Sequence, residues 1–234
     1  MSSIACSDGP LPENLDKIWA EFFSQERSIN DLFAHPILFP LQRPREMVEM
    51  VRVASEIRPR VLLDIGSDKG GGLWAWLKFL PTLEAVIACE IRGLPYQKQF
   101  ELAFPKVDFL WLPYSSYKND TITAVEDWLA IREPSSSIFK IDVAFLDGDK
   151  SWFHKDFEAY KPLMHTDAVV VFHDIQDPAP RSSFELCRSR GTTSSTFIDV
   201  DDYTHLSGRE PKTEHDNWLL HWQGRSCGLG IIHL

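Results

Sequence analysis

The stretch RVLLDIGSDKGGG at residues 60–72 constrains the fold of this chain more than any other part. Val61–Ile65 is a short apolar run with the length and branching of a buried strand. Gly66 ends the run, three more glycines follow, and residues 73–80 have the composition of a helix. A strand, a glycine-rich turn and a helix bring backbone N–H groups and a helix N-terminus up to a ligand. We therefore expect an α/β domain that binds a ligand at this turn.

The rest of the chain alternates between short apolar runs and helical patterns. Six further strands are predicted at residues 85–89, 107–112, 141–146, 168–172, 196–200 and 228–234. Helices are predicted at residues 14–23, 29–33, 44–57, 72–80, 96–104, 121–131, 152–163 and 184–190, and a loop at 133–137. This alternation is typical of a Rossmann-like, doubly wound α/β fold, with a mostly parallel sheet and helices on both faces. Right-handed crossovers then place the carboxyl ends of the parallel strands along one edge, where ligands bind.

The first 45 residues differ from the remainder. Two short helices with the aromatic anchors Trp19, Phe22 and Phe33 are interrupted by prolines. We predict a helical cap at residues 1–45 and one main domain at 46–234. The aromatic side chains either cover the sheet or help to enclose a ligand, and those left exposed would favour a homodimer.

Charge and composition exclude several classes of protein. The chain has 234 residues and a net charge of −10, without a basic stripe, so we expect no nucleic-acid partner. Its apolar runs fall far short of the roughly 20 residues that span a bilayer, and the N-terminus lacks the pattern of a signal peptide. Four widely spaced cysteines are typical of reduced thiols, and the expected location is cytoplasmic.

The glycine pattern indicates which nucleotide-like ligand the turn would accept. Dinucleotide-binding turns need a second glycine where this chain has Asp68, whose carboxylate would repel a pyrophosphate. Asp64 and Asp68 instead favour a cationic ligand, such as the ammonium or sulfonium group of S-adenosylmethionine. Glu90, at the end of the second strand, is placed to hold a ribose diol in either ligand. The alternative is that Glu90 is only an exposed charge at a strand end.

A second set of polar residues follows the fourth and fifth strands. Asp147 comes directly after residues 141–146, and His173 and Asp174 come after residues 168–172. Because these strand ends are expected to be neighbours, the three side chains could bind Mg²⁺ or Mn²⁺, which prefer oxygen ligands. Such an ion would bind two oxygens of a diol or catechol-like molecule that accepts a transferred group. It would also lower the pKa of the reacting hydroxyl. Alternatively, His173 forms a hydrogen bond with substrate or a loop.

Lys150 follows Asp147 by three residues and could reach the same acceptor. A lysine desolvated beside a metal can have a lowered pKa and act as a general base. The alternative is a solvated lysine at the start of the next helix.

Three blocks together carry a resemblance to a known family. VLLDIGSDKGGG, ACE and FLDGDKSWFHKDFEAYKPLMHTDAVVVFHDI resemble the class I S-adenosylmethionine-dependent methyltransferases. More narrowly, they are similar to the small-molecule O-methyltransferase branch, which includes cephalosporin-hydroxylase-like and macrolide sugar O-methyltransferase proteins. The resemblance covers about residues 42–176 and implies seven strands with an antiparallel final hairpin. Lys150 departs from it, because histidine is commoner at this position.

The resemblance also implies roles for individual residues. Gly66 and its neighbours would contact the methionine part of the cofactor, Glu90 the ribose, and Tyr114 and Ser115 the adenine. The residues expected to bind the cofactor are Asp64, Gly66, Ser67, Gly70, Glu90, Tyr114, Ser115 and Asp147. The related enzymes bind a divalent cation at the place of Asp147, His173 and Asp174. In catechol O-methyltransferases a lysine spaced like Lys150 is the general base, so the expected catalytic residues are Lys150 and Asp147.

The function expected from the sequence is therefore methyl transfer from S-adenosylmethionine to a hydroxyl of a small molecule, a diol, catechol-like compound or sugar, assisted by Mg²⁺ or Mn²⁺. A nucleic-acid methyltransferase is disfavoured, because the fourth strand ends in LDGD rather than in an N-P-P-Y type of block. An NAD(P)-dependent Rossmann oxidoreductase and a non-catalytic nucleoside-binding module are the alternatives. Specificity for the acceptor is expected from the cap and residues 177–225.

Overall fold

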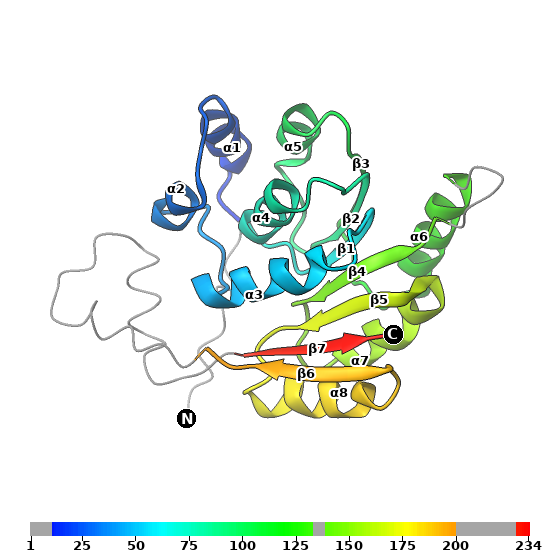
Figure 1. The fold of residues 1–234 in the computed structure, drawn as a ribbon. Coiled ribbons are helices and arrows are strands. Elements are labelled where there is room, and N and C mark those ends of the chain that lie inside the picture. The colour runs from blue at the N-terminus through cyan, green and yellow to red at the C-terminus, as the bar shows by residue number, and fades with distance from the viewer. Residues whose placement is uncertain (1–10, 133–138, 200–227) are drawn as a thin grey trace, which may run out of the picture.

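Seven strands form a single sheet in the order β3-β2-β1-β4-β5-β7-β6 (Figure 1). The structure is a computed structural model, and it describes residues 11–132, 139–199 and 228–234. The strands are β1 (Val61–Ile65), β2 (Ala85–Cys89), β3 (Asp108–Leu112), β4 (Ile141–Leu146), β5 (Met164–Phe172), β6 (Thr193–Phe197) and β7 (Leu229–His233). The helices are α1 (Leu15–Phe23), α2 (Ile29–Ala34), α3 (Pro44–Ser55), α4 (Gly71–Phe79), α5 (Gln97–Ala103), α6 (Asn119–Ile131), α7 (Phe153–Tyr160) and α8 (Pro178–Arg188), with a 3₁₀ turn at Lys161–Leu163.

The strand register brings the predicted site residues to one edge. Strands β3, β2, β1, β4 and β5 are parallel neighbours, and β7 runs antiparallel between β5 and β6. Ile65, the last residue of β1, pairs with Cys89 of β2 and with Leu146 of β4, and Leu146 pairs with Phe172 of β5. The four strands therefore end level with one another. The mostly parallel sheet and its antiparallel final hairpin are as predicted.

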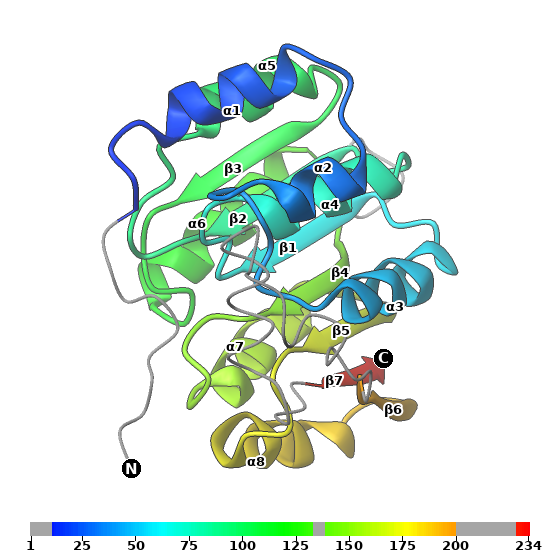
Figure 2. The same ribbon diagram turned by 90° about the vertical axis from the view of Figure 1, so that its left-hand side faces the viewer.

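Helices cover both faces of the sheet (Figures 1 and 2). Alternate strand residues face opposite sides, so Leu62 belongs to the core under helices α1 to α5, and Leu63 to the core under α6 to α8. Two cysteines, Cys89 and Cys187, are buried as free thiols. Within the described residues, no helix is long and apolar enough to cross a membrane.

The N-terminal helices pack on α4, α5 and the glycine turn. The Trp19 indole N–H donates to the carbonyl of Lys69 at 2.7 Å, and its ring lies 4.7 Å from that of Phe100 on α5. Figure 2 shows α1 alongside α5. The cap therefore contacts the turn itself, rather than only covering the sheet. Helix α3 begins at Pro44, so the boundary predicted at residue 45 lies in its first turn.

Several helices and strands begin or end at residues other than those predicted from the sequence. Helix α8 begins at Pro178 rather than at residue 184, because prolines are compatible with a first helical turn although they read as helix breakers. Strand β5 begins at Met164, and a register shift separates its first residues from the part that pairs regularly with β4. Strand β6 lies at 193–197 rather than 196–200, since its exposed Thr and Ser residues give no apolar pattern. The loop predicted at 133–137 lies outside the described residues.

A short segment between α2 and α3, residues 37–43, crosses the start of α4, and we call it the strap. Gly71 lies beneath it, and a Cβ atom there would lie 2.3 Å from the carbonyl oxygen of Leu38 and 2.9 Å from the nitrogen of Pro40. Leu38 and Phe39 are buried. The strap therefore lies on the helix that follows the glycine turn.

Replacing Gly71 tests this contact. Gly71→Ala should lower the free energy of unfolding by about 1–3 kcal/mol, because backbone atoms of the strap would have to move. Gly72→Ala is the matched control: its Cβ would meet only the movable side chain of Gln42, at 3.3 Å, and it should gain up to about 1 kcal/mol of helix propensity. Urea unfolding measures both. Equal changes in the free energy of unfolding of the two variants would show that the strap does not press on α4.

Candidate active site

The glycine turn touches the end of β4. Gly66 has a φ of 89°, and a Cβ atom there would lie 2.5 Å from the carbonyl oxygen of Asp147. Gly70, with a φ of 90°, precedes the first residue of α4. Both positions need glycine, the first for close approach as well as for conformation. The turn and Asp147 are therefore direct neighbours.

Asp64 and Ser67 form a buried pair beneath this turn. The Ser67 hydroxyl donates to a carboxylate oxygen of Asp64 at 2.7 Å, and Asp64 is only 1% exposed. Burial raises the pKa of Asp64 to about 7 against the opposing effect of the Ser67 hydrogen bond, and the carboxylates of Asp147 and Glu90 add to the rise. Asp64 therefore titrates near neutral pH and is a candidate partner for a cation.

Glu90 is tied to the glycine turn. Its Oε2 accepts the backbone N–H of Asp68 at 2.9 Å, and its Oε1 accepts the backbone N–H and the Nε–H of Arg92, each at 3.0 Å. The Arg92 guanidinium also pairs with the Asp68 carboxylate. With 5% of its surface exposed, Glu90 is not the exposed strand-end charge considered as an alternative. Arg92 was missed by sequence reasoning, although a cation two residues after the acid was the available signal.

A charged cluster lies where β4 and β5 end. The Lys150 ammonium donates to Asp147 Oδ1 and to Asp174 Oδ2. His173 Nδ1 lies 3.0 Å from Asp147 Oδ1 and 3.4 Å from Asp174 Oδ1. The residues predicted to act on the acceptor are therefore together, and Lys150 is not a solvated lysine.

The cluster shifts the pKa of each of its members. Burial alone would lower the pKa values of Lys150 and His173, but the carboxylates of Asp147 and Asp174 outweigh it and raise both. Burial would raise the pKa values of the two aspartates, but the His173 and Lys150 cations lower them, that of Asp174 well below its usual value. In this arrangement the pKa of Lys150 is raised, opposite to the lowered pKa expected for a lysine beside a metal, because Lys150 has two carboxylate partners.

Two residues that sequence reasoning missed complete the cluster. Gln42 of the strap donates from Nε2 to Asp147 Oδ2 at 2.8 Å. Glu46 of α3 is fully buried; its Oε1 accepts the Gly228 N–H at 2.6 Å, and its Oε2 lies 3.4 Å from His173 Nε2. More than 100 residues separate Gln42 and Glu46 from these partners in the chain. The only local signal was a glutamate in the first turn of a helix.

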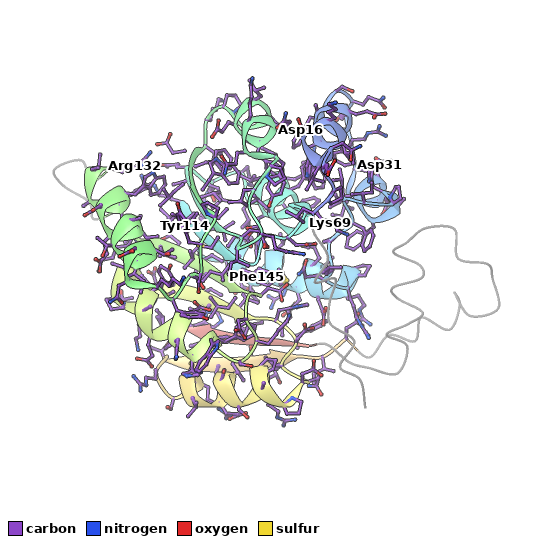
Figure 3. All side chains as sticks on the ribbon, turned by 180° about the vertical axis from the view of Figure 1, so that it is seen from behind. Asp16, Asp31, Lys69, Tyr114, Arg132 and Phe145 are labelled. Atoms are coloured by element: carbon purple, nitrogen blue, oxygen red, sulfur yellow. The ribbon has the colours of Figure 1, made fainter. Side chains whose placement is uncertain are left out.

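Tyr114 and Ser115, the residues predicted to contact adenine, follow β3. Tyr114 is 60% exposed just after β3, and Ser115 uses its carbonyl to accept the Thr121 hydroxyl at 2.9 Å. Figure 3 labels Tyr114 together with Lys69 of the glycine turn and Phe145 of β4. In the described part of the chain, no hydrogen bond joins Tyr114 or Ser115 to Glu90. Their role toward adenine stays a prediction.

No family model matches the sequence, and no curated protein matches it. Solved structures do match over nearly the whole chain. An O-methyltransferase from Bacillus cereus, solved with SAH, has a TM-score of 0.57 and 15% identity, and covers 97% of this chain and 94% of its own. TomG from Streptomyces achromogenes, an O-methyltransferase of tomaymycin synthesis solved with SAM, also has a TM-score of 0.57 and 15% identity, over 95% and 97%. A putative caffeoyl-CoA O-methyltransferase from Staphylococcus aureus has a TM-score of 0.56 and 16% identity, over 95% and 99%.

This chain has the α/β, Rossmann-like methyltransferase fold. The resemblance found in the sequence is confirmed at the level of architecture. Within the methyltransferase fold, the glycine turn, Glu90 and the charged cluster all lie along the edge where the parallel strands end.

The donors expected to hold a divalent cation in this fold have other partners. One ligand atom from each of Asp147, His173 and Asp174 lies within 4.8 Å of the others, so the predicted set does come together. Lys150, however, bonds to both aspartates, and a carboxylate lies beside each ring nitrogen of His173. Metal-binding imidazole nitrogens must be unprotonated. The set as arranged binds an ammonium and does not fit a divalent cation.

Glu46→Gln tests the buried end of this cluster. The variant should lose about 1–3 kcal/mol of unfolding free energy at neutral pH, because the Gly228 N–H and His173 lose a charged acceptor. Glu56→Gln, at the exposed end of the same helix, should change stability by no more than about 0.5 kcal/mol. Urea unfolding compares the two. A Glu46→Gln protein as stable as the control would mean that the buried carboxylate contributes nothing to stability.

Proposed function

We propose that this protein is an S-adenosylmethionine-dependent O-methyltransferase that methylates a hydroxyl of a small molecule. The observation that carries the proposal is the contact between the glycine turn and the charged cluster, at Gly66 and Asp147. A cofactor held on the turn would present its methyl group beside Lys150. The site would thus hold a methyl donor and the hydroxyl that accepts the methyl group side by side.

The turn suits a cationic nucleoside better than a dinucleotide. Asp64 would face the charged methionine part of the cofactor, and Glu90 the ribose diol. Asp68 stands where a pyrophosphate-binding turn needs glycine, which weighs against the NAD(P)-dependent oxidoreductase. The solved relatives from Bacillus cereus and Streptomyces achromogenes carry SAH and SAM, and these ligands support the same choice for this chain.

We infer that the strap moves when the cofactor enters. The cavity over the glycine turn, lined by Phe39, Gln42, Asp64 and Gly66 among others, has a volume of about 20 Å³. Such a cavity holds about one water molecule. Gln42 links the strap to Asp147, so displacing the strap would also free one oxygen of that carboxylate.

The reaction needs little beyond positioning. The acceptor oxygen bonds to the methyl carbon as the carbon–sulfur bond breaks, and the sulfonium becomes a neutral thioether. The acceptor's own proton leaves to water. The expected acceptors remain diols, catechol-like compounds and sugars. The Mg²⁺ or Mn²⁺ expected from the sequence would need the donors of Asp147, His173 and Asp174, and Lys150 contacts both of these aspartates.

Cofactor binding and turnover test the proposal together. Titration calorimetry should detect binding of S-adenosylmethionine and none of NAD, and mass spectrometry should find methylated product from a panel of phenols, catechols and diols. Glu90→Ala should weaken cofactor binding by about 1–3 kcal/mol. Glu84→Ala, at the exposed opposite end of β2, should not. Binding without turnover across the panel would favour a non-catalytic nucleoside-binding module, and NAD binding would favour the oxidoreductase.

The raised pKa of Asp64 predicts how cofactor affinity depends on pH. Because its folded-state pKa is about 7, Asp64 is mostly protonated below that value and must ionise to pair with a cation. Affinity should therefore rise with pH up to about 7, by at most about tenfold per unit. Asp64→Asn should remove the dependence. A wild-type affinity that does not change over this range would place Asp64 away from the cofactor's charge.

A further inference from the structure

The position that a bridging metal ion would take is filled by a side chain of this protein. The Lys150 ammonium bonds to one oxygen of Asp147, at the end of β4, and one of Asp174, just past β5. These are two of the three residues whose donor atoms lie within 4.8 Å of one another. A divalent cation that joined the same two carboxylates would have to displace the ammonium.

The remaining donor atoms of the set are also engaged. Asp147 Oδ2 accepts the Gln42 amide at 2.8 Å. The ring of His173 lies between carboxylates, with Asp147 at 3.0 Å on one side and Glu46 at 3.4 Å on the other. Glu46 has no exposed surface and His173 has 3% of its side chain exposed, so water cannot replace these contacts.

The backbone also fixes this arrangement. Asp174 has a φ of 57°, in the left-handed region that only a few non-glycine residues adopt. Its carbonyl accepts the Asp177 N–H at 3.0 Å, just ahead of α8. A conformation of this kind persists only where the surroundings determine it. Here the ion pair to Lys150 and the turn into α8 both hold Asp174.

We propose that the Lys150 ammonium takes the place of the divalent cation, so that the methyltransferase works without a metal and binds one oxygen of its acceptor. The proposal rests on the function proposed above. An ammonium has three N–H donors, and two of them go to Asp147 and Asp174. The Lys150 side chain is partly exposed, and in this proposal its third donor binds the acceptor oxygen.

This choice of cation replaces the acceptors expected from the sequence, which were diols, catechol-like compounds and sugars, with compounds that have one acidic hydroxyl. A metal ion holds two neighbouring oxygens, whereas a single N–H holds one. An ammonium paired with two carboxylates does not remove a proton, so the hydroxyl must be acidic enough to lose its proton to water. The acceptor oxyanion then bonds to the methyl carbon, the carbon–sulfur bond breaks with its electron pair going to sulfur, and Lys150 keeps its three protons. Phenols and enols with a single hydroxyl meet both requirements.

Metal binding tests the proposal without relying on turnover. Protein dialysed against EDTA is titrated with Mn²⁺, and the free ion is followed by electron paramagnetic resonance. The wild-type chain should bind no Mn²⁺ at millimolar concentration. Lys150→Ala should bind it at least about tenfold more tightly than wild type, because two carboxylates are released. Lys155→Ala, an exposed lysine five residues on, should behave like wild type.

Stoichiometric Mn²⁺ binding to the wild-type chain would overturn the proposal, and so would a Lys150→Ala protein that folds and binds no more tightly than wild type. If Lys150→Ala does not fold, the wild-type titration alone tests the proposal.

Turnover assays then test which class of acceptor is methylated. Wild type in EDTA should methylate a simple phenol at least as well as a catechol. A catechol requirement restored by Mn²⁺ would contradict the proposal, while methylation of neither compound, with Mn²⁺ unbound, would count against the proposed function instead.

Discussion

Buried charges that must be paired hold this site together. Asp147 and Asp174 follow β4 and β5, and Glu46 lies in α3. The three carboxylates meet around Lys150 and His173. Breaking a buried pair leaves an uncompensated charge, which commonly costs several kcal/mol. Glu46 extends the constraint to the last strand, because it accepts the N–H of Gly228 next to β7. The cluster thus fastens elements distant in the chain to the sheet edge where a ligand would bind.

The cap and the strap connect that cluster to the glycine turn. Trp19 of the cap bonds to the backbone of the turn, and Gln42 of the strap bonds to Asp147. Between them the strap lies on Gly71, where only a residue without a side chain leaves room. Moving the strap therefore changes a contact of the cluster as well as the opening above the turn. A ligand that displaced the strap would therefore also change the contacts of Asp147.

Much of this could be predicted from sequence. Strands β1, β2 and β4 are mostly apolar, interrupted only by Asp64 in β1 and Asp142 in β4, and their bounds match the prediction residue for residue. In a parallel sheet, the residues that follow the strands lie along one edge. This is why Glu90, Asp147 and Asp174 could be predicted to lie at the same edge. The contacts of Gln42, Glu46 and Arg92 could not be predicted, because they depend on tertiary packing that leaves no periodic pattern. Strand β6 was misplaced for a similar reason: it pairs through its backbone and exposes polar side chains.

The pKa of Lys150 could not be predicted from the residues next to it in the sequence. A lysine removed from water has a lowered pKa when it stands alone, and such a lysine is a base. Two carboxylates in contact with the ammonium raise the lysine pKa instead. Each attraction at about 3–4 Å in a partly buried site is on the order of several kcal/mol, which is comparable to the desolvation penalty of one ammonium. One spacing in the sequence, an aspartate three residues before a lysine, is thus compatible with a base or with a fixed cation. Asp174, which follows another strand, supplies the second carboxylate that raises the pKa of Lys150.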